Sequence, residues 1–410
     1  MGAKIFIFLY LSVVTSAQFD PFHRLSLNCA NQWFLSTVVF FFPGHTNQTN
    51  RLIKKGKQQL KKTKSRKMSL VKQIKFGNTG IKISPIIVGC MSYGSKNWMP
   101  WIEDDKEKIF AILKHCYDRG LRTFDTADVY SNGVSEKLLG EFLRRCNIRR
   151  ETVVIMTKIF CPVDESFPEG SRLFNTTPEM ALDLTNQQGL SRKHIMAGVA
   201  NSVKRLGTYI DVLQIHRFDP DTPIKETMRA LNDVIERGDV RYIGASSMLP
   251  TQFAEMQACA DKYGWHQFVN MQSCYNLLYR EDERDLNIYC KKHKVALTPW
   301  SPNQRGILCK PLNKESDRSK TDGIIAQRHL LDLQPHAVEI VNRVEELAKK
   351  KGVSMANIST AWVIAKGAMP IIGMSSIERV DDNIKALDVE LTEEDLKYLE
   401  EPYKPRTFMW

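Results

Sequence analysis

The stretch Arg122-Thr-Phe-Asp-Thr-Ala-Asp-Val-Tyr130 and the run Thr152-Val-Val-Ile-Met-Thr-Lys158 lie on either side of an amphipathic segment, Ser135–Cys146. Each flanking run is short, apolar and rich in β-branched or aromatic residues, which favours a buried strand. The segment between them has apolar residues at helical spacing. Strand, helix and strand in this order predict two parallel strands joined by a crossover helix.

The same unit repeats along the chain from residue 68. Strands are predicted at Pro85–Gly89, Arg122–Asp125, Thr152–Lys158, Ile210–His216, Val240–Ala245, Phe268–Gln272, Ala296–Trp300 and Pro370–Gly373. Helices are predicted at Lys106–Arg119, Ser135–Cys146, Ser191–Leu206, Ile224–Arg237, Gln252–Lys262, Glu281–His293, Ser354–Lys366 and Ile377–Ala386. Eight such units predict an α/β fold, a single (β/α)8 barrel, and a doubly wound sheet is the alternative.

Four further segments add to this barrel. Residues Lys72–Ser84 alternate polar and apolar around a Gly-Asn-Thr-Gly turn, which predicts a β-hairpin closing the lower mouth. Long loops follow the third and seventh strands, where the spacing between strand ends rises to 58 and 73 residues. The loop after the first strand carries Tyr93, Trp98 and Trp101, and these either line an apolar pocket or pack on a neighbour.

Charge is distributed unevenly over the 410 residues. The formal net charge is +12, but the first 67 residues contain eleven basic residues and one acidic residue. The remainder is therefore nearly neutral, which argues against a nucleic-acid-binding surface on the folded part.

The basic leader, residues 1–67, contains two apolar stretches, Ile5–Val14 and Trp33–Phe42, followed by the basic run Arg51–Lys67. Both stretches are too short to span a membrane. The leader is interpreted as a secretion signal with a propeptide, as a targeting arm, or as sequence upstream of a true start at Met68. The last reading is favoured, so residues 68–410 are predicted to form the barrel.

The nine cysteines bear on the compartment. Their number is odd and no Cys-x-x-Cys occurs, so neither a disulfide framework nor a zinc site is indicated. Cys116 and Cys146 fall within helical patterns as reduced thiols. A cytoplasmic protein is expected, with secretion or targeting as the alternative if the leader is genuine.

Charged and polar residues end the strands of the predicted barrel. Asp125, Lys158 and His216 each end a strand, and Tyr130 follows five residues after Asp125, so all four are expected at one rim. Taken singly, the aspartate, tyrosine and histidine are ordinary turn or core residues. A lysine at the end of an apolar strand needs a partner, however, and Asp125 is the candidate. A cation beside Tyr130 is expected to lower the pKa of its phenol, making it a general acid.

The pattern Phe-Asp-Thr-Ala-Asp-Val-Tyr-Ser-Asn-Gly-x-Ser-Glu at residues 124–136, with Lys and His at later strand ends, resembles the aldo-keto reductases. The resemblance extends over residues 68–403 and is strongest to fungal aryl-alcohol dehydrogenases. It implies reduction of an aldehyde or ketone, aryl or aliphatic, by a catalytic tetrad. Tyr130 would protonate the carbonyl oxygen, the Lys158–Asp125 pair would tune the tyrosine, and His216 would orient the carbonyl.

No Gly-x-Gly-x-x-Gly follows a strand, so a Rossmann cradle is not indicated. The resemblance implies an extended NADPH instead. Ser246, Ser247 and Gln272 would hold the nicotinamide carboxamide and Trp300 would stack on the ring. The nicotinamide end would be bordered by Gly89, Cys90, Met91 and Asp125. The pyrophosphate would lie along Ser301, Pro302 and Arg305.

At the adenosine end, the resemblance implies contacts from Ser375, Arg379 and Asn383. Arg379 would bind the 2′-phosphate of NADPH. Met374 stands where many relatives have Lys or Arg, so the preference for NADPH over NADH rests on Arg379. No metal, nucleic-acid partner or integral membrane segment is predicted, and the oligomeric state is undetermined. The alternative function is a cofactor-binding regulatory subunit, like the potassium-channel β subunits.

Overall fold

Eight parallel strands form the centre of the protein. The computed structural model describes residues 70–168, 176–314, 321–323 and 332–408, so the predicted leader, residues 1–67, lies outside the described residues. The strands are β3 (Ile87–Gly89), β4 (Thr123–Asp125), β5 (Val154–Ile159), β6 (Ile210–Ile215), β7 (Val240–Ser246), β8 (Phe268–Gln272), β9 (Ala296–Leu297) and β10 (Ile371–Gly373). They correspond to the eight predicted strands.

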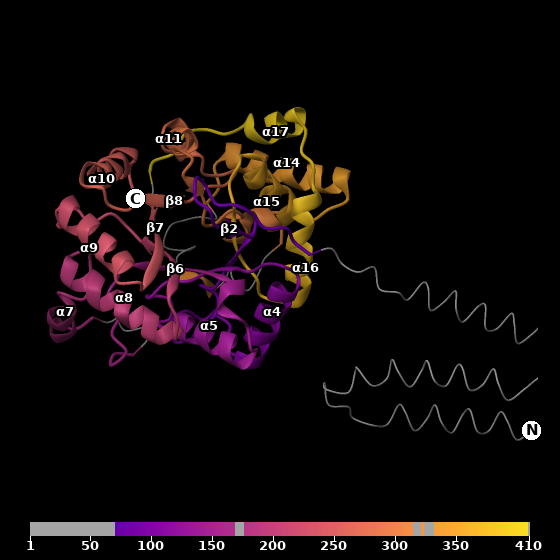
Figure 1. Cartoon of the computed structure of the whole chain (residues 1–410). Coiled ribbons are helices and arrows are strands. Elements are labelled where there is room, and N and C mark those ends of the chain that lie inside the picture. Colours follow the sequence, from indigo (N-terminus) through magenta and orange to yellow (C-terminus); the bar gives the residue numbers. More distant parts are fainter. Residues whose placement is uncertain (1–69, 169–175, 315–320, 324–331, 409–410) are drawn as a thin grey trace, which may run out of the picture. The chain divides into compact units, whose positions relative to one another are not determined.

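The sheet closes on itself. Its strand order is β10-β3-β4-β5-β6-β7-β8-β9, with every neighbouring pair parallel. Backbone hydrogen bonds join the two edges: the amide of Met369 donates to the carbonyl of Leu297 at 2.8 Å, and that of Ile371 to Pro299 at 3.0 Å. This closure confirms the (β/α)8 barrel, and the doubly wound alternative was wrong (Figure 1).

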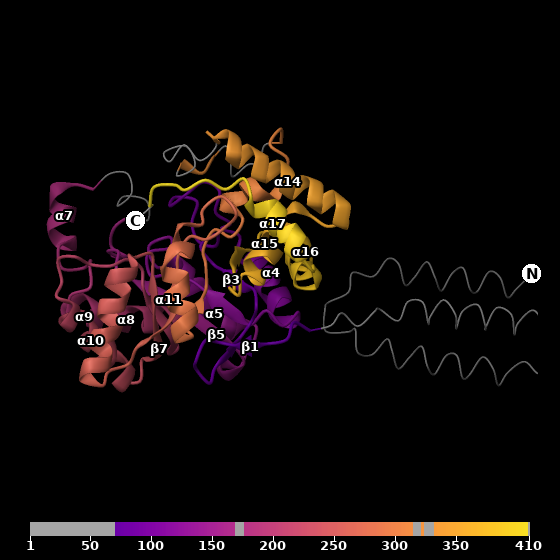
Figure 2. The ribbon, with the colours of Figure 1, turned by 90° about the horizontal axis from the view of Figure 1, so that it is seen from above.

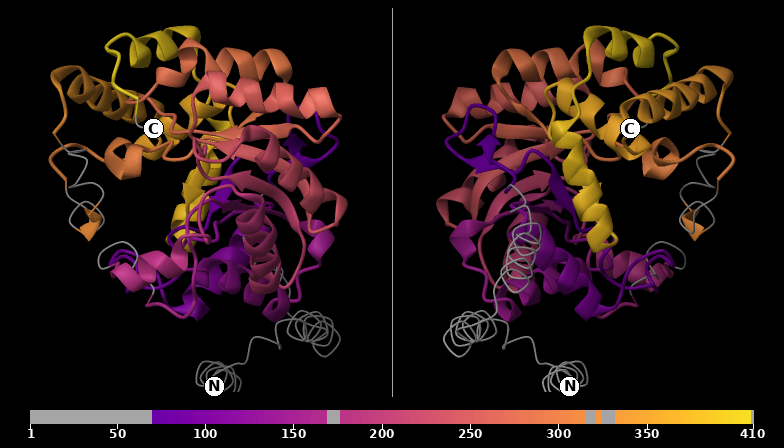
Figure 3. Two further views of the ribbon diagram at one scale, coloured as in Figure 1. Left: turned by 90° about the vertical axis from the view of Figure 1, so that its left-hand side faces the viewer. Right: turned by 90° about the vertical axis from the view of Figure 1, so that its right-hand side faces the viewer.

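Helices cover the outside of the strands, as Figures 1 and 3 show. Eight of them match predicted helices: α4 (Lys106–Asp118), α5 (Val134–Arg145), α8 (Arg192–Leu206), α9 (Ile224–Glu236), α10 (Pro250–Tyr263), α11 (Leu286–His293), α15 (Met355–Ala365) and α16 (Ile377–Lys385). The helix predicted over Glu281–His293 is divided, because Asp285 leaves the helical conformation and caps α11 through the amide of Leu286. A short 3-10 helix, η3 (Glu281–Arg284), precedes this break.

Both long loops predicted after strands contain helices. The first holds α7 (Pro178–Leu184), the second holds η4 (Gln304–Cys309) and α14 (Pro335–Lys351), and α17 (Glu393–Glu400) follows the barrel. Helix α14 has proline in its first turn, a glycine C-cap at Gly352 and a buried apolar face, which are helix signals that the sequence analysis missed. In Figure 2, α7 and α14 lie toward one end of the barrel and β1 lies toward the other.

The predicted hairpin is present and closes the lower mouth. Strands β1 (Ile74–Lys75) and β2 (Lys82–Ile83) pair antiparallel. Phe76 and Ile83 are fully buried and pack in one cluster with Ile87, Met156 and Val212 from the barrel strands. The end of the barrel opposite the strand carboxyl ends is therefore filled by apolar side chains.

Helices α5 and α8 approach closely at Gly140. A Cβ placed on this residue would lie 2.3 Å from the carbonyl oxygen of Leu206, which is backbone and cannot turn aside. The contact matters for the site, because α5 and α8 carry the buried ion pair described below.

We expect Gly140→Ala to lower the free energy of unfolding by about 1–3 kcal/mol, because the two helices must separate. Thermal unfolding would show this as a lower Tm. The control is Gly80→Ala, where no atom lies within 4 Å of the added Cβ and no loss is expected. Equal melting temperatures for the two variants would contradict this account of the helix contact.

Candidate active site

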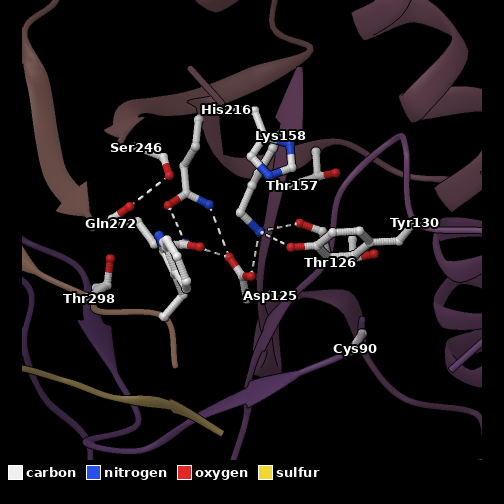
Figure 4. Close-up of polar contacts among 12 residues, drawn as sticks. Cys90, Asp125, Thr126, Tyr130, Thr157, Lys158, His216, Ser246, Gln272 and Thr298 are labelled. Atoms are coloured by element: carbon white, nitrogen blue, oxygen red, sulfur yellow. Dashed lines mark hydrogen bonds and ion pairs between the residues drawn. The ribbon is translucent and has the colours of Figure 1, made fainter. Parts of the chain in front are cut away.

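The four predicted catalytic residues meet at the carboxyl ends of the strands. Asp125 is the last residue of β4, Lys158 is near the end of β5, and His216 follows β6 directly. Tyr130 lies on the turn after β4. Figure 4 shows the Lys158 amino group between Asp125 and Tyr130, with His216 beside them. The barrel thus brings together residues that are up to 91 positions apart in the chain.

Lys158 is the centre of this group. Its Nζ donates to Asp125 Oδ1 at 2.5 Å, to the carbonyl oxygen of Thr126 at 2.8 Å and to Tyr130 Oη at 3.3 Å. The lysine side chain is 1% exposed and that of Asp125 is 3% exposed. Burial opposes the ammonium charge, but Asp125 and Tyr130 outweigh burial and raise the pKa of Lys158. The amino group therefore stays charged at neutral pH.

The pKa of Tyr130 corrects the sequence analysis. Burial raises this pKa, and Lys158 lowers it only in part, so the net direction is upward. The predicted effect of the cation was right, but the predicted net lowering was wrong, because burial of the phenol could not be read from the sequence. A phenol with a raised pKa stays protonated at neutral pH and keeps its proton available for donation.

The turn after Tyr130 needs unusual backbone geometry. Ser131, Asn132 and Gly133 have φ values of 50°, 52° and 91°, in the left-handed region that glycine and asparagine adopt most readily. A Cβ on Gly133 would lie 2.7 Å from Cδ of Arg205. The geometry explains the Asn132-Gly133 pair, and the close approach shows that Arg205 packs against the turn.

A buried ion pair behind this turn was not found by the sequence analysis. Arg205 Nε on α8 donates to Glu136 Oε2 on α5 at 2.6 Å, and Thr157 Oγ1 on β5 donates to Glu136 Oε1 at 2.5 Å. Thr157 precedes Lys158, so Glu136 ties α5 and α8 to the strand that carries the lysine. The only available signal was the glutamate of the Gly-x-Ser-Glu pattern, whose partner lies 69 residues away.

Aromatic side chains wall one side of Tyr130. Trp98 lies with its ring centroid 6.0 Å from that of Tyr130, and His216 lies at the same distance on an edge-to-face geometry. Trp98, Met99 and Ile102 form a buried cluster that also contacts Trp101. Tyr93, by contrast, is 1% exposed and donates to the backbone carbonyl of Met374, so it is a packing residue.

The residues predicted to hold the nicotinamide contact one another in space. Ser246 Oγ donates to the carbonyl of Gln272 at 2.6 Å and lies 3.2 Å from Ser247 Oγ, which accepts from Trp300 Nε1 at 3.0 Å. Gln272 Nε2 in turn donates to Asp125 Oδ2 at 2.8 Å.

The other residues predicted to border the nicotinamide also reach this region. Gly89 pairs with Asp125 in the sheet, and the amide of Cys90 donates to the Asp125 carbonyl at 2.8 Å. Met91 packs with the aromatic cluster. One network therefore runs from Trp300 to Tyr130.

The loop after β9 carries the residues predicted to follow the pyrophosphate. Ser301 and Arg305 have φ values of 52° and 51°, and Pro302 between them is buried. Buried Asn276 holds the loop by donating to the carbonyl of Ser301 at 2.9 Å. The guanidinium of Arg305 is paired with Asp322 at 2.8 Å, a partner that the sequence did not reveal.

The residues predicted for the adenosine end lie on and before α16. Ser375 and Arg379 are exposed, and the Arg379 side chain makes no ion pair with any residue of the described chain. Asn383 Nδ2 donates to the backbone carbonyl of Arg379 at 2.7 Å and contacts the sulfur of buried Met374. Strand β10, which precedes these residues, pairs with β3.

Neither a cluster of metal ligands nor a membrane-spanning helix occurs among the described residues. Within residues 70–168, 176–314, 321–323 and 332–408, no three or more histidine, cysteine or acidic side chains are grouped as metal ligands would be. No helix in these ranges has the length and apolarity that crossing a membrane requires.

Comparison with known proteins decides the family. A sequence model of the Aldo/keto reductase family matches residues 85–404. The chain belongs to the aldo/keto reductase family. "Putative aryl-alcohol dehydrogenase AAD16" of Saccharomyces cerevisiae is 62% identical over 339 residues, which cover 83% of this chain and 99% of the relative. Versiconal hemiacetal acetate reductase of Aspergillus parasiticus is 45% identical over 336 residues, which cover 81% of this chain and 97% of the relative.

Among solved structures, a thermostable aldo-keto reductase in complex with the inhibitor epalrestat matches with a TM-score of 0.61 and 26% identity, over 81% of this chain and 99% of the other. Like its relatives, this aldo/keto reductase is an oxidoreductase that acts on carbonyl groups, in a family whose members use NAD(P)H. The resemblance to fungal aryl-alcohol dehydrogenases is confirmed.

Proposed function

We propose that this aldo/keto reductase reduces aldehydes and ketones with NADPH and that Tyr130 donates the proton. The observation that carries the proposal is the buried Lys158 ammonium, which contacts both the Asp125 carboxylate and the Tyr130 hydroxyl. When bound, NADPH would supply a hydride to the carbonyl carbon. Tyr130 would give its proton to the carbonyl oxygen, and Lys158 would stabilise the phenolate that remains.

His216 orients the substrate in this proposal. Its ring meets the Tyr130 ring edge-to-face, so a carbonyl oxygen accepting from the phenol also lies near the imidazole. The aromatic cluster at Trp98 supplies a flat apolar wall beside the reacting oxygen. Together with the aryl-alcohol dehydrogenase name of a close relative, this wall supports aromatic aldehydes as substrates, with aliphatic aldehydes as the second class.

The residues present fit a nicotinamide dinucleotide. The side-chain NH₂ group of Gln272 donates to Asp125 and to Gln214. The amide oxygen of Gln272 is therefore left to accept a hydrogen bond from the carboxamide of a nicotinamide. Trp300 is oriented by its bond to Ser247 and offers a ring face for stacking. Exposed Arg379 is available for a phosphate, whereas Arg305 already pairs with Asp322 and contributes less charge than its residue type suggests.

We propose further that residues 68–410 carry the activity in the cytoplasm. The family match at residues 85–404 supports the extent of the domain. The free thiols of Cys90, Cys116 and Cys290 are buried and fit a reducing compartment.

Tyr130→Phe tests the proton donor. We expect kcat for aldehyde reduction to fall by about 10²–10⁴-fold, because the donor is lost, while the Kd for NADPH stays within about twofold. Tyr398→Phe, which removes an exposed hydroxyl bonded to Glu346, is the matched control. Reduction at the wild-type rate by Tyr130→Phe would overturn the assignment. If the wild-type protein binds NADPH but does not reduce aldehydes, a regulatory subunit would be favoured instead.

Lys158→Met tests the cation. Because Lys158 lowers the pKa of Tyr130, its removal is expected to raise that pKa further. Alcohol oxidation needs the phenolate, so its rate at a fixed pH falls more than that of reduction, and the rising limb of its pH profile moves to higher pH. Lys366→Met, outside the site, is the control and leaves the profile in place. A limb that stays where it is or moves down would refute the role of Lys158.

Arg379→Ala tests the preference for NADPH. We expect kcat/KM for NADPH to fall by about 10–100-fold with little change for NADH, because a charge-assisted contact to the 2′-phosphate is lost. Lys385→Ala on the same helix removes a cation paired with Asp382 and is the control. A wild-type enzyme that prefers NADH would contradict the proposed cofactor.

A further inference from the structure

Gln214 lies inside the barrel, at the level of the catalytic ion pair. It is the fifth residue of β6, two positions before His216, and it is fully buried. Its Nε2 donates to Asp125 Oδ2 at 3.0 Å, and its Oε1 accepts from Gln272 Nε2 at 2.7 Å and from Asn270 Nδ2 at 2.9 Å. A buried glutamine with three such bonds connects the cofactor side of the site to the aspartate.

The direction of these hydrogen bonds is determined by chemistry. A carboxylate only accepts, so the NH₂ group of Gln214 must face Asp125 and its oxygen must face the two other amides. Asn270 Nδ2 also donates to Thr298 Oγ1 at 2.9 Å. Asn270 has little room to move, because a Cβ on Gly244 would lie 1.9 Å from its Oδ1. The amide orientations are therefore mutually consistent from β9 to β4.

The network holds the Asp125 carboxylate at both oxygens. Oδ2 accepts from Gln214 and Gln272, while Oδ1 accepts from Lys158. Three donors leave the carboxylate little rotational freedom, and charge-assisted bonds of this kind are strong in a buried site. Oδ1, together with the carbonyl oxygen of Thr126, directs the Lys158 amino group toward Tyr130.

We propose that Gln214 is a positioning residue of this reductase: it holds the Asp125 carboxylate so that Lys158 faces the Tyr130 hydroxyl. The proposal rests on the proposed function of Tyr130. Gln214 acts through Asp125, and its substitution should change the catalytic step rather than the binding of NADPH.

The test starts with Gln214→Leu. This substitution keeps the side-chain volume approximately, and it leaves Gln272 bonded to Asp125 and Asn270 bonded to Thr298, so we expect the variant to fold. We expect kcat for aldehyde reduction to fall about tenfold, with KM for the aldehyde and Kd for NADPH within about twofold. The rising limb of the alcohol-oxidation profile should move to higher pH, because the less neutralised Asp125 charge disfavours the phenolate.

The titratable and charged groups around this network enter the pH readout. They come from the ends of β3, β4, β5 and β6 and from the turn after β4: Cys90, Asp125, Lys158, His216, Arg217 and Tyr130. Among these groups, Asp125 bonds directly to Gln214, and Lys158 and Tyr130 are linked to Gln214 through Asp125. A shift of the rising limb of the alcohol-oxidation profile therefore reports on Asp125, Lys158 and Tyr130.

Gln214→Glu supplies a rescue. A protonated carboxyl at this position donates to Asp125 as the amide does, and its other oxygen still accepts from Gln272 and Asn270. We expect near-wild-type reduction at low pH and a loss as pH rises, because two carboxylates then face each other across about 3 Å. The rate of reduction by the wild-type enzyme should not change over the same pH range.

Gln257→Leu is the matched structural control. Gln257 is also buried and bonds to the amide and carbonyl of Phe268, outside the site. It should lower Tm while leaving kcat and the pH profiles unchanged. If Gln214→Leu behaves like Gln257→Leu, with a lower Tm but an unchanged kcat and pH profile, the positioning role is refuted. If Tyr130→Phe retains activity, the proposed function itself fails, so the two failures are distinguishable.

Discussion

The site of this protein depends on one buried ion pair. Asp125 and Lys158 are almost completely removed from water, and either charge alone would be costly in the barrel interior. Together, and with amide donors on the second carboxylate oxygen, they form a neutral unit. The lysine can then place a positive charge beside a phenol, which is the requirement for a tyrosine that gives up a proton and regains it.

Closure of the barrel makes this pairing possible. Parallel strands deliver their carboxyl ends to one rim, and the hairpin with Phe76 fills the opposite end with apolar side chains. The rim is then stiffened from outside by the Arg205–Glu136 pair, which joins two helices to the strand that carries Lys158. Rigid strands on one side and a braced turn on the other hold Tyr130 within reach of the lysine.

Burial and charge act on Tyr130 in opposite directions. The sequence places a cation near the phenol, and from this alone a lowered pKa is expected. Desolvation of the buried phenol, which the sequence does not reveal, raises the pKa of Tyr130 by more than Lys158 lowers it. The phenol is therefore more firmly protonated than expected. The direction suits the role proposed for Tyr130 in carbonyl reduction, which consumes a proton.

Local patterns in the sequence determined much of this protein: the eight strands, the barrel, the hairpin and the meeting of Asp125, Tyr130, Lys158 and His216, the proposed catalytic residues, at one rim. These follow from periodicity and from polar residues at strand ends, which are properties of a few neighbouring residues. The tertiary structure alone decided the partners: Arg205 for Glu136, Asp322 for Arg305, and Gln214 with Gln272 for Asp125. Apart from the Arg305 pair, these contacts join residues 69 to 147 positions apart. No local pattern records such a contact, because it exists only once the barrel has closed and excluded water.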